Sequence, residues 1–326
     1  MRTPAFVSLA AFSLSLSCGV ARAQAPASAT PPPAAPPTKD ATPPVRPGAG
    51  AAFESAQGTE VASGFRFTEG PTWWSGRFLF CDMAASTMYT IDPGTPGAKA
   101  EEFRKPSDKA VGATLDRDGR LVVCHFAGKV TRTEADGKVA TIAEKVDGKK
   151  LARPNDLAVR SDGSIYFSDF GAGPDSSRGL FRIAPDGKVT LLDKDYQAPN
   201  GVVFSPDEKT LYVADYAGKT VISYAVAADG TLSGRRTFID FTPDKAGGNP
   251  DGMRVDTAGN LYTTGPGGIW VYQADGQAMA FLPLIGATNM AFGGSDGRTL
   301  FITAGSKVMT IRTKIAGVVP GKASAK

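Results

Sequence analysis

The chain has 326 residues, of which 42% are hydrophobic and 21% charged, and it contains 38 glycines and 24 prolines. This composition indicates a globular core built with many turns, and therefore many short strands. The net charge of +4 is too small to indicate a nucleic-acid partner. Beyond the N-terminal segment no run reaches the roughly 18 consecutive apolar residues of a membrane span, so we expect no membrane-spanning segment.

The N-terminal segment has the pattern of an exported protein. Residues 1–23 combine a basic start at Arg2, an apolar run from Ala5 to Val20 and a small-x-small ending at residues 21–23, which is typical of a cleaved secretory signal peptide. Residues 24–57 are rich in Pro and Ala and cannot bury enough apolar surface to fold, so we expect a disordered linker. The mature protein is therefore expected to be periplasmic or secreted.

A repeated unit occupies the chain from about residue 59 to 315. Each copy has a turn with Asp or Gly followed by a short β-rich run, as in DGRLVVCH and DGSIYFSD. Equivalent positions in the six runs are Leu79, Leu121, Ile165, Leu211, Leu261 and Leu300. Their spacings are 42, 44, 46, 50 and 39 residues, which is the length of a four-stranded propeller blade. The sequence predicts an all-β, six-bladed β-propeller with antiparallel blades over residues 58–316, followed by a flexible tail at 317–326.

The last unit predicts how the ring closes. It lacks an outer strand, while the strand-like piece TEVASGF at residues 59–65 precedes the first unit. We therefore expect an N-terminal strand to complete the last blade, which would remove the exposed sheet edges.

Two cysteines lie within the expected propeller. Cys81 and Cys124 each occupy an apolar run, FLFCD and LVVCH. An exported protein is compatible with a disulfide between them, and the apolar surroundings are equally compatible with free thiols. We favour buried free thiols.

One position at the start of each fourth strand is equivalent in all six units. It precedes the reference Leu or Ile by 10 or 11 residues, and if the strand is the innermost of its blade, this position faces the central channel at one end. Five of the six residues have a side-chain oxygen. These ring positions are Glu69, Val111, Asn155, Asn200, Asp251 and Asn289.

Converging oxygen atoms predict a site for a hard divalent cation. Glu69 and Asp251 would balance its charge, and the amides of Asn155 and Asn200 would add neutral ligands, a set that favours calcium although other divalent ions are compatible. Asn, Asp and Gly also open strands simply as turn residues, but a Glu and four polar positions in register favour a cation site. With one His and no Cys/His spacing pattern in the chain, a zinc-type site is not available.

The motifs around these positions resemble the gluconolactonase family. FTEGPTWW, RPNDLAV, APNGVVFSPDEKTLYVAD and NPDGMRVDTAGNLYTTGPGGIWV are similar to this family, which also contains senescence-marker protein (regucalcin) and, more distantly, diisopropylfluorophosphatase. The resemblance covers roughly residues 60–312. It implies a six-bladed propeller with one catalytic calcium or similar ion, lactone hydrolysis, and metal-ligand roles for Glu69, Asn155, Asn200 and Asp251.

The resemblance also has two departures. Val111 stands where the family typically has an Asn that helps bind the substrate, and the segment CHFAG lacks the family's acidic residue. The identity of the substrate is therefore less defined by the resemblance than the metal site is.

The expected catalytic groups lie at the same end of the channel. We hypothesise that the ion polarises a lactone carbonyl while Asp251 delivers water. His125 and Asp169, which close second strands at this end, and Asn289 are candidates for contacts with substrate or ligands. His125 suits a general base, although strand-end His and Asp are commonly turn residues. The chain has no G-x-S-x-G motif, which disfavours a serine hydrolase.

These observations predict a calcium-dependent hydrolase that opens a small-molecule sugar lactone, such as a gluconolactone. Two alternatives remain open. One is a propeller used as a binding or scaffold module with a structural calcium, and the other is a phosphotriester or aryl-ester hydrolase that uses the same ion. The sequence does not define the oligomeric state.

Overall fold

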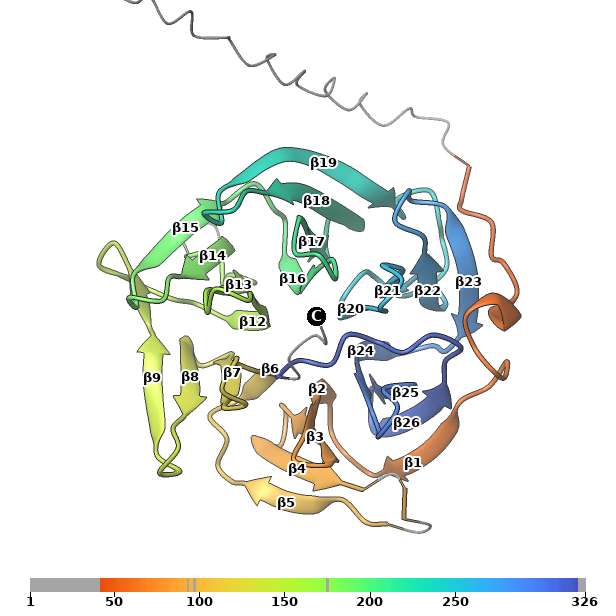
Figure 1. Ribbon diagram of the computed structural model, residues 1–326, viewed down its shortest axis with the longest axis horizontal. Coiled ribbons are helices and arrows are strands. Elements are labelled where there is room, and N and C mark those ends of the chain that lie inside the picture. The colour runs from red at the N-terminus through yellow and green to blue at the C-terminus, as the bar shows by residue number, and fades with distance from the viewer. Residues whose placement is uncertain (1–41, 93, 96–97, 174–175, 322–326) are drawn as a thin grey trace, which may run out of the picture. The chain divides into compact units, whose positions relative to one another are not determined.

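Six four-stranded antiparallel sheets surround a central axis in the computed structural model (Figure 1). The structure describes residues 42–92, 94–95, 98–173 and 176–321, all within one unit, Ala34–Lys326. The expected signal peptide and the start of the expected linker lie outside these ranges. The predicted six-bladed β-propeller is confirmed.

Every blade repeats the same order of strands from the channel to the outer wall. The inner strands are β2 (Thr68–Trp74), β6 (Ala110–Leu115), β12 (Pro154–Val159), β16 (Pro199–Phe204), β20 (Met253–Val255) and β24 (Ala287–Gly293). The second strands are β3 (Arg77–Asp82), β7 (Leu121–His125), β13 (Ile165–Asp169), β17 (Thr210–Asp215), β21 (Leu261–Gly265) and β25 (Thr299–Ala304).

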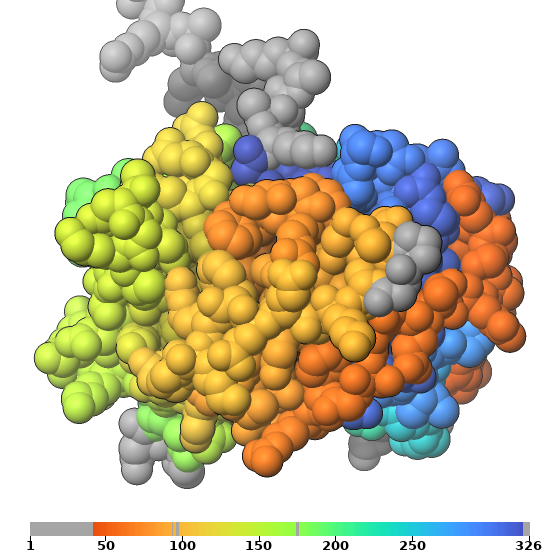
Figure 2. Space-filling view, turned by 90° about the horizontal axis from the view of Figure 1, so that it is seen from below, coloured from red at the N-terminus to blue at the C-terminus, as the bar shows by residue number. Residues whose placement is uncertain are grey.

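The outer half of each blade completes the wall of the propeller, whose first two blades are seen from the side in Figure 2. The third strands are β4 (Thr87–Ile91), β8 (Lys129–Thr133), β14 (Gly179–Ile183), β18 (Thr220–Val226), β22 (Gly268–Tyr272) and β26 (Lys307–Arg312). The outer strands are β5 (Glu101–Arg104), β9 (Val139–Ala143), β15 (Val189–Asp193), β19 (Leu232–Asp240), β23 (Ala278–Pro283) and β1 (Thr59–Ser63). A hairpin of β10 (Lys145–Val146) and β11 (Lys149–Lys150) connects the second and third blades.

The ring closes through the N-terminal strand. β1 pairs antiparallel with β26, with Thr59 opposite Thr310, so the sixth sheet has the order β1-β26-β25-β24. The expected closure is confirmed. Because the last blade combines both ends of the propeller sequence, it has no missing outer strand and no extra exposed edge.

The hydrophobic core lies between blades. All six residues of β6 are buried, while no residue of β5 and only Ala143 of β9 is buried. Neighbouring blades contact through their flat faces; for example, the rings of Phe78 in the first blade and Phe301 in the sixth stack with centroids 4.2 Å apart. Cys81 and Cys124 are free and buried. No helix within the described ranges is long and apolar enough to span a membrane.

Segments before and after the repeats also pack on the propeller. A short 3-10 helix, η1 (Ala49–Ala51), leads to Phe53, which is 1% exposed and contacts the Tyr262 ring at 5.9 Å. The packed unit therefore begins within the segment 24–57 that we expected to be a linker.

The C-terminal segment crosses the channel end at which the inner strands finish. Gly317 N donates to Gly297 O at 3.0 Å, and Val318 N donates to Val255 O at 3.0 Å, and Figure 1 shows this segment running towards the centre of the ring. The expected tail at 317–326 is thus held at its beginning, while residues 322–326 lie outside the described ranges. The ring positions lie at the other end of the channel, where the inner strands begin.

Candidate metal centre and active site

The structure places the six ring positions together at the start of the inner strands. Glu69, Val111, Asn155 and Asn200 are the second residues of their strands, Asn289 is the third residue of β24, and Asp251 lies two residues before β20. Each inner strand contacts its two neighbours around the whole ring. The residues therefore approach one axis, although up to 220 positions separate them in the chain.

A local irregularity turns these residues out of the regular ladder. In five inner strands the pairing register with the second strand shifts at the ring position, as occurs at a β-bulge, which re-aims side chains. The shifts fall between Glu69 and Thr72, Ala110 and Ala113, Pro154 and Leu157, Pro199 and Val202, and Ala287 and Asn289.

Glycines behind the ring allow the inner strands to approach closely. A Cβ atom on Gly112 would lie 2.2 Å from Asn155 O, and one on Gly201 would lie 2.1 Å from Asp251 O. Gly201 N instead donates a hydrogen bond to that Asp251 oxygen at 3.0 Å. Backbone contacts between blades thus fix the spacing of the ring side chains.

The predicted ligand side chains are buried and only partly satisfied. Glu69, Asn155, Asn200 and Asp251 are 4%, 6%, 4% and 8% exposed. Within the part of the chain that the structure describes, Asn200 Oδ1 and Asp251 Oδ1 have no hydrogen-bond partner. A buried oxygen without a partner costs about 1–3 kcal/mol, so these two atoms fit a site whose missing partner is a cation.

The two ring carboxyls are poorly placed to be charged without a cation. Burial raises the pKa of Glu69, the negative charge of Asp156 raises it further, and the Gly70 N–H and the positive charge of Arg254 oppose the shift. Burial also raises the pKa of Asp251 well above its ordinary value, and the charges of Glu69 and Asp156 add to this rise. A divalent cation would reverse both effects, because it favours the charged forms.

A third carboxyl lies beside the ring and is already paired with a cation. Asp156 is fully buried, and its Oδ2 lies 3.7 Å from Arg254 Nη1 and accepts a hydrogen bond from Asn289 Nδ2 at 3.4 Å. Arg254 Nη1 also donates to Met253 O at 2.6 Å. Since the Arg254 guanidinium offsets the charge of Asp156, Glu69 and Asp251 remain as the two carboxylates that a divalent ion would balance.

The donor set mixes carboxylate and amide oxygens. Among the described residues, no three His, Cys, Asp or Glu side chains gather in a group that could hold a metal ion. A cation at the ring therefore needs the neutral oxygens of Asn155 and Asn200 beside Glu69 and Asp251, which is the chemistry of a hard ion with oxygen ligands.

Hydroxyl groups of the second strands hold the backbone of the ring. Thr264 Oγ1 accepts from Asp251 N at 2.7 Å and donates to Asn249 O at 3.2 Å. Ser168 Oγ donates to Asn200 O at 2.6 Å. These side chains occupy the next-to-last position of their second strands, and they fix ligand residues from outside the channel.

We expect Thr264→Val to weaken the binding of a divalent cation at the ring and to lower the kcat of a reaction that depends on Asp251 about tenfold. The valine keeps the volume but leaves the buried Asp251 N–H without its acceptor, and small displacements of a reacting group are costly. Steady-state kinetics and titration calorimetry with calcium measure both effects, and Thr264→Ser should restore them. Thr263→Val is the matched control, because Thr263 Oγ1 donates to Thr264 O at 2.9 Å and does not contact Asp251. Equal kcat losses in the two variants would contradict this role.

The structure places His125 away from free solvent. It is 3% exposed, with Nδ1 2.9 Å from Ser107 O and Nε2 2.8 Å from Thr131 Oγ1. Burial lowers its pKa to about 4. Nδ1 therefore holds the loop before β6 and Nε2 is bonded to β8, which favours a structural role over proton transfer.

Asp169 is similarly occupied. Its Oδ1 accepts from Arg153 N and Gly171 N at 2.8 and 2.9 Å, and its Oδ2 accepts from Ala152 N and Ser177 Oγ at 2.8 and 2.7 Å. The carboxylate fixes the segment that leads into Asn155. Of the three candidates for secondary contacts, Asn289 is the one that the structure places in the ring.

Sequence reasoning did not identify Asp156 and Arg254 as part of the site. A signal for each is present. Asp156 stands where four other blades have Gly after the ring position, and Arg254 is a charged residue between the apolar Met253 and Val255 of an inner strand. In both cases a charged side chain interrupts the repeat pattern where its neighbours are buried.

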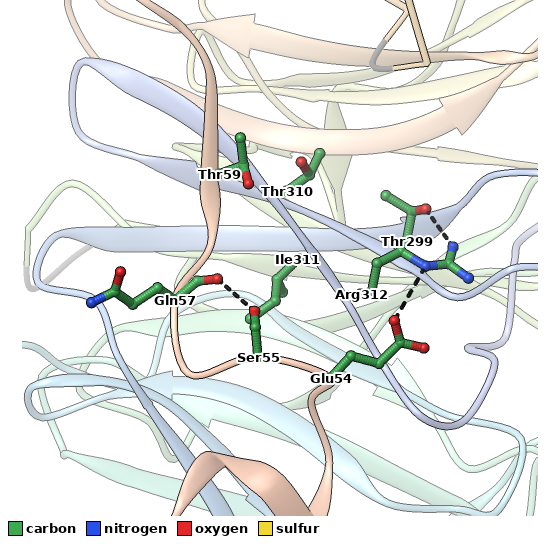
Figure 3. Close-up of a pocket in the computed structure, with 8 residues that line it drawn as sticks. All are labelled: Glu54, Ser55, Gln57, Thr59, Thr299, Thr310, Ile311 and Arg312. Carbon is green, nitrogen blue, oxygen red and sulfur yellow. Dashed lines mark hydrogen bonds and ion pairs between the residues drawn. The ribbon is translucent and has the colours of Figure 1, made fainter.

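A separate hollow lies at the outer edge of the last blade, away from the channel (Figure 3). It has a volume of about 210 Å³ and is lined by residues of β1, β25, β26 and the segment before β1. Arg312 Nη1 donates to Thr299 Oγ1 at 3.0 Å, and Ser55 Oγ donates to Gln57 O at 2.7 Å. None of its lining residues belongs to the oxygen ring.

The fold is that of a six-bladed propeller with a ring of oxygen-bearing side chains at the start of its inner strands. Residues 67–306 match the family described as SMP-30/Gluconolactonase/LRE-like region, and the chain belongs to this family.

Individual relatives cover most of the propeller. The chain is 32% identical to a gluconolactonase of Zymomonas mobilis subsp. mobilis over 297 residues, covering 79% of this chain and 81% of the relative. It is also 32% identical to pentonolactonase XacC of Haloferax volcanii, covering 74% of this chain and 83% of the relative. The solved structure of a gluconolactonase from Xanthomonas campestris superposes with a TM-score of 0.73 at 30% identity, covering 83% of this chain and 94% of that one.

Proposed function

We propose that this enzyme hydrolyses a sugar lactone in the channel and that its site holds one calcium ion. The family, together with relatives named gluconolactonase and pentonolactonase, supports a lactone-hydrolysing enzyme. The observation that supports the ion most directly is the pair of buried, unpartnered oxygens, Asn200 Oδ1 and Asp251 Oδ1. Glu69 and Asn155 would complete the set, and other divalent ions suit the same donors.

The chain's own groups account for the rest of the chemistry. When bound, calcium would supply a Lewis acid that polarises the lactone carbonyl. Asp251 accepts the proton of the attacking water at the carboxylate oxygen that does not hold the ion, since Oδ1, which has no protein partner, would bind the ion. Thr264 holds the backbone of Asp251 in place for this transfer, and Asn289 is bonded to Asp156 rather than free to move.

We expect removal of the metal to abolish lactone hydrolysis. After treatment with a chelator, glucono-lactone and simple γ-lactones should show at least a hundredfold lower rate, and added calcium should restore it. Aryl esters and phosphotriesters tested in parallel distinguish a lactonase from an esterase that uses the same ion. Full activity after complete metal removal, confirmed by elemental measurement, would contradict the proposed role of calcium.

We also propose that the protein is exported. The proposal rests on the signal-peptide pattern of residues 1–23, which lie outside the described residues. Cell fractionation with detection of the mature N-terminus tests it, and an uncleaved cytoplasmic protein would contradict it.

A further inference from the structure

Four consecutive blades place a large side chain directly after their second strands. Its backbone N–H donates to a carbonyl two residues before the ring position of the same blade. The pairs are Met83 N with Phe67 O at 3.0 Å, Phe126 N with Lys109 O at 3.0 Å, Phe170 N with Arg153 O at 3.0 Å, and Tyr216 N with Ala198 O at 2.9 Å. A strand rises about 3.3 Å per residue. These residues therefore lie roughly 7 Å from the oxygen ring along the strand direction, beyond the end at which the inner strands begin.

Three of these four side chains are aromatic, and each aromatic ring lies beside that of the next blade. The centroids of Phe126 and Phe170 are 6.0 Å apart, and those of Phe170 and Tyr216 are also 6.0 Å apart. All three side chains are half-buried. We call these three residues the aromatic arc.

The equal spacing places the aromatic arc at the channel. With six blades around an axis, equivalent points in neighbouring blades are 60° apart, so their separation equals their distance from the axis. Taken as equivalent points, the three centroids with their 6.0 Å spacings lie about 6 Å from the axis. In the two remaining blades the equivalent residues are Pro266 and Gly305, so the arc covers one side of the channel mouth.

The same side is apolar at the level of the ring. Val111 is the one apolar ring position, and Phe126 and Met83 pack against the hydrophobic cluster that contains it. The Arg153 guanidinium lies 5.6 Å from the Phe126 ring, close enough for a cation–π contact that holds this ring in place. The mouth thus presents fixed carbon surface above a buried set of oxygen atoms.

We propose that the aromatic arc is a substrate subsite that binds the carbon chain of the lactone while the ester group lies at the oxygen ring. The proposal rests on the proposed function and adds a substrate class, namely lactones with an exocyclic carbon chain. The 7 Å step from ring to arc matches the reach of a lactone ring with a short side chain. Aromatic faces bind such chains through their C–H surface, and specificity then rises with the apolar area covered.

The test is a series of γ-lactones with side chains of zero to four carbons, measured with the calcium-loaded enzyme. We expect kcat/KM to rise about fourfold per added methylene group, as for full burial of that group. In Phe170→Ala the rise should fall below about twofold per methylene. Phe170→Leu, which nearly preserves volume, should keep an intermediate dependence and guards against loss of folding. Phe103→Ala, on the outer strand β5 where Phe103 contacts the Trp74 ring at 5.0 Å, should leave the series unchanged.

A binding measurement separates recognition from turnover. The corresponding γ-alkyl lactams are not readily hydrolysed, and calorimetry should show their Kd tightening with chain length in the wild type and much less in Phe170→Ala. A flat series in the wild type, or an undiminished slope in Phe170→Ala, overturns the subsite even if glucono-lactone is hydrolysed. If no lactone is hydrolysed, the proposed function fails and the subsite fails with it.

Discussion

Asp251→Asn is expected to lower kcat by a factor of about 10²–10⁴ at saturating calcium, the usual range for loss of a general base. The asparagine keeps the shape of the side chain but cannot accept a proton. Asp251 is suited to this role because it is buried in the oxygen ring and its backbone is held by Thr264. Measuring kcat over a range of calcium concentrations separates lost chemistry from weakened metal binding.

Asp256→Asn is the matched control for Asp251→Asn. Asp256 belongs to the same blade and is fully buried, but it lies at the far end of the inner strand, where Oδ1 accepts from Asn260 N at 2.9 Å and Oδ2 from Asn260 Nδ2 at 2.7 Å. Its substitution should lower the melting temperature and leave kcat within about threefold. If Asp251→Asn behaved in the same way, Asp251 would have no part in proton transfer.

The architecture was accessible from the sequence because each blade repeats the same turn and strand pattern. The spacing from Leu79 to Leu300 gave the number of blades, and the unmatched strand before the first blade gave the closure seen between β1 and β26. The two ends of the packed unit were harder to predict from the sequence. Phe53 and Val319 are buried in the core cluster of the last blades although both stand in segments rich in small residues and Pro, where single apolar contacts leave no periodic signal.

The candidate site was accessible only in part. A constant offset identified the six ring positions, because equivalent positions in a propeller must face the same channel. What a side chain contacts across blades has no such signature. The imidazole of His125 is a side chain that can act as a general base, but Ser107 and Thr131 are bonded to its two nitrogens. Arg254 and Asp156 meet across the channel at 3.7 Å although 98 positions separate them, and no local pattern encodes that pairing.

Glu69→Gln is expected to weaken calcium binding at least a hundredfold and to reduce hydrolysis in proportion at limiting calcium. The variant removes one of the two carboxylates that balance the ion, while the glutamine retains a neutral oxygen at the same place. Titration calorimetry and calcium-dependent kinetics measure the effect. Asp256→Asn again serves as the control, since it also removes a buried carboxylate but leaves the oxygen ring intact.

Glu69→Gln weakens calcium binding but is expected to stabilise the metal-free protein. Because burial raises the pKa of Glu69 above its ordinary value of 4.5, the folded state binds this proton more tightly than the unfolded state does. The stability of the metal-free wild type should therefore fall as the pH rises above about 4.5, by linkage. Glu69→Gln lacks this loss of stability. Its melting temperature in chelator should therefore exceed that of the wild type by a margin that grows with pH. With calcium added, the wild type should have the higher melting temperature. Parallel pH curves for the two proteins in chelator would show that Glu69 is not a buried carboxylate lacking a positively charged partner, and the cation site would lose its main acidic ligand.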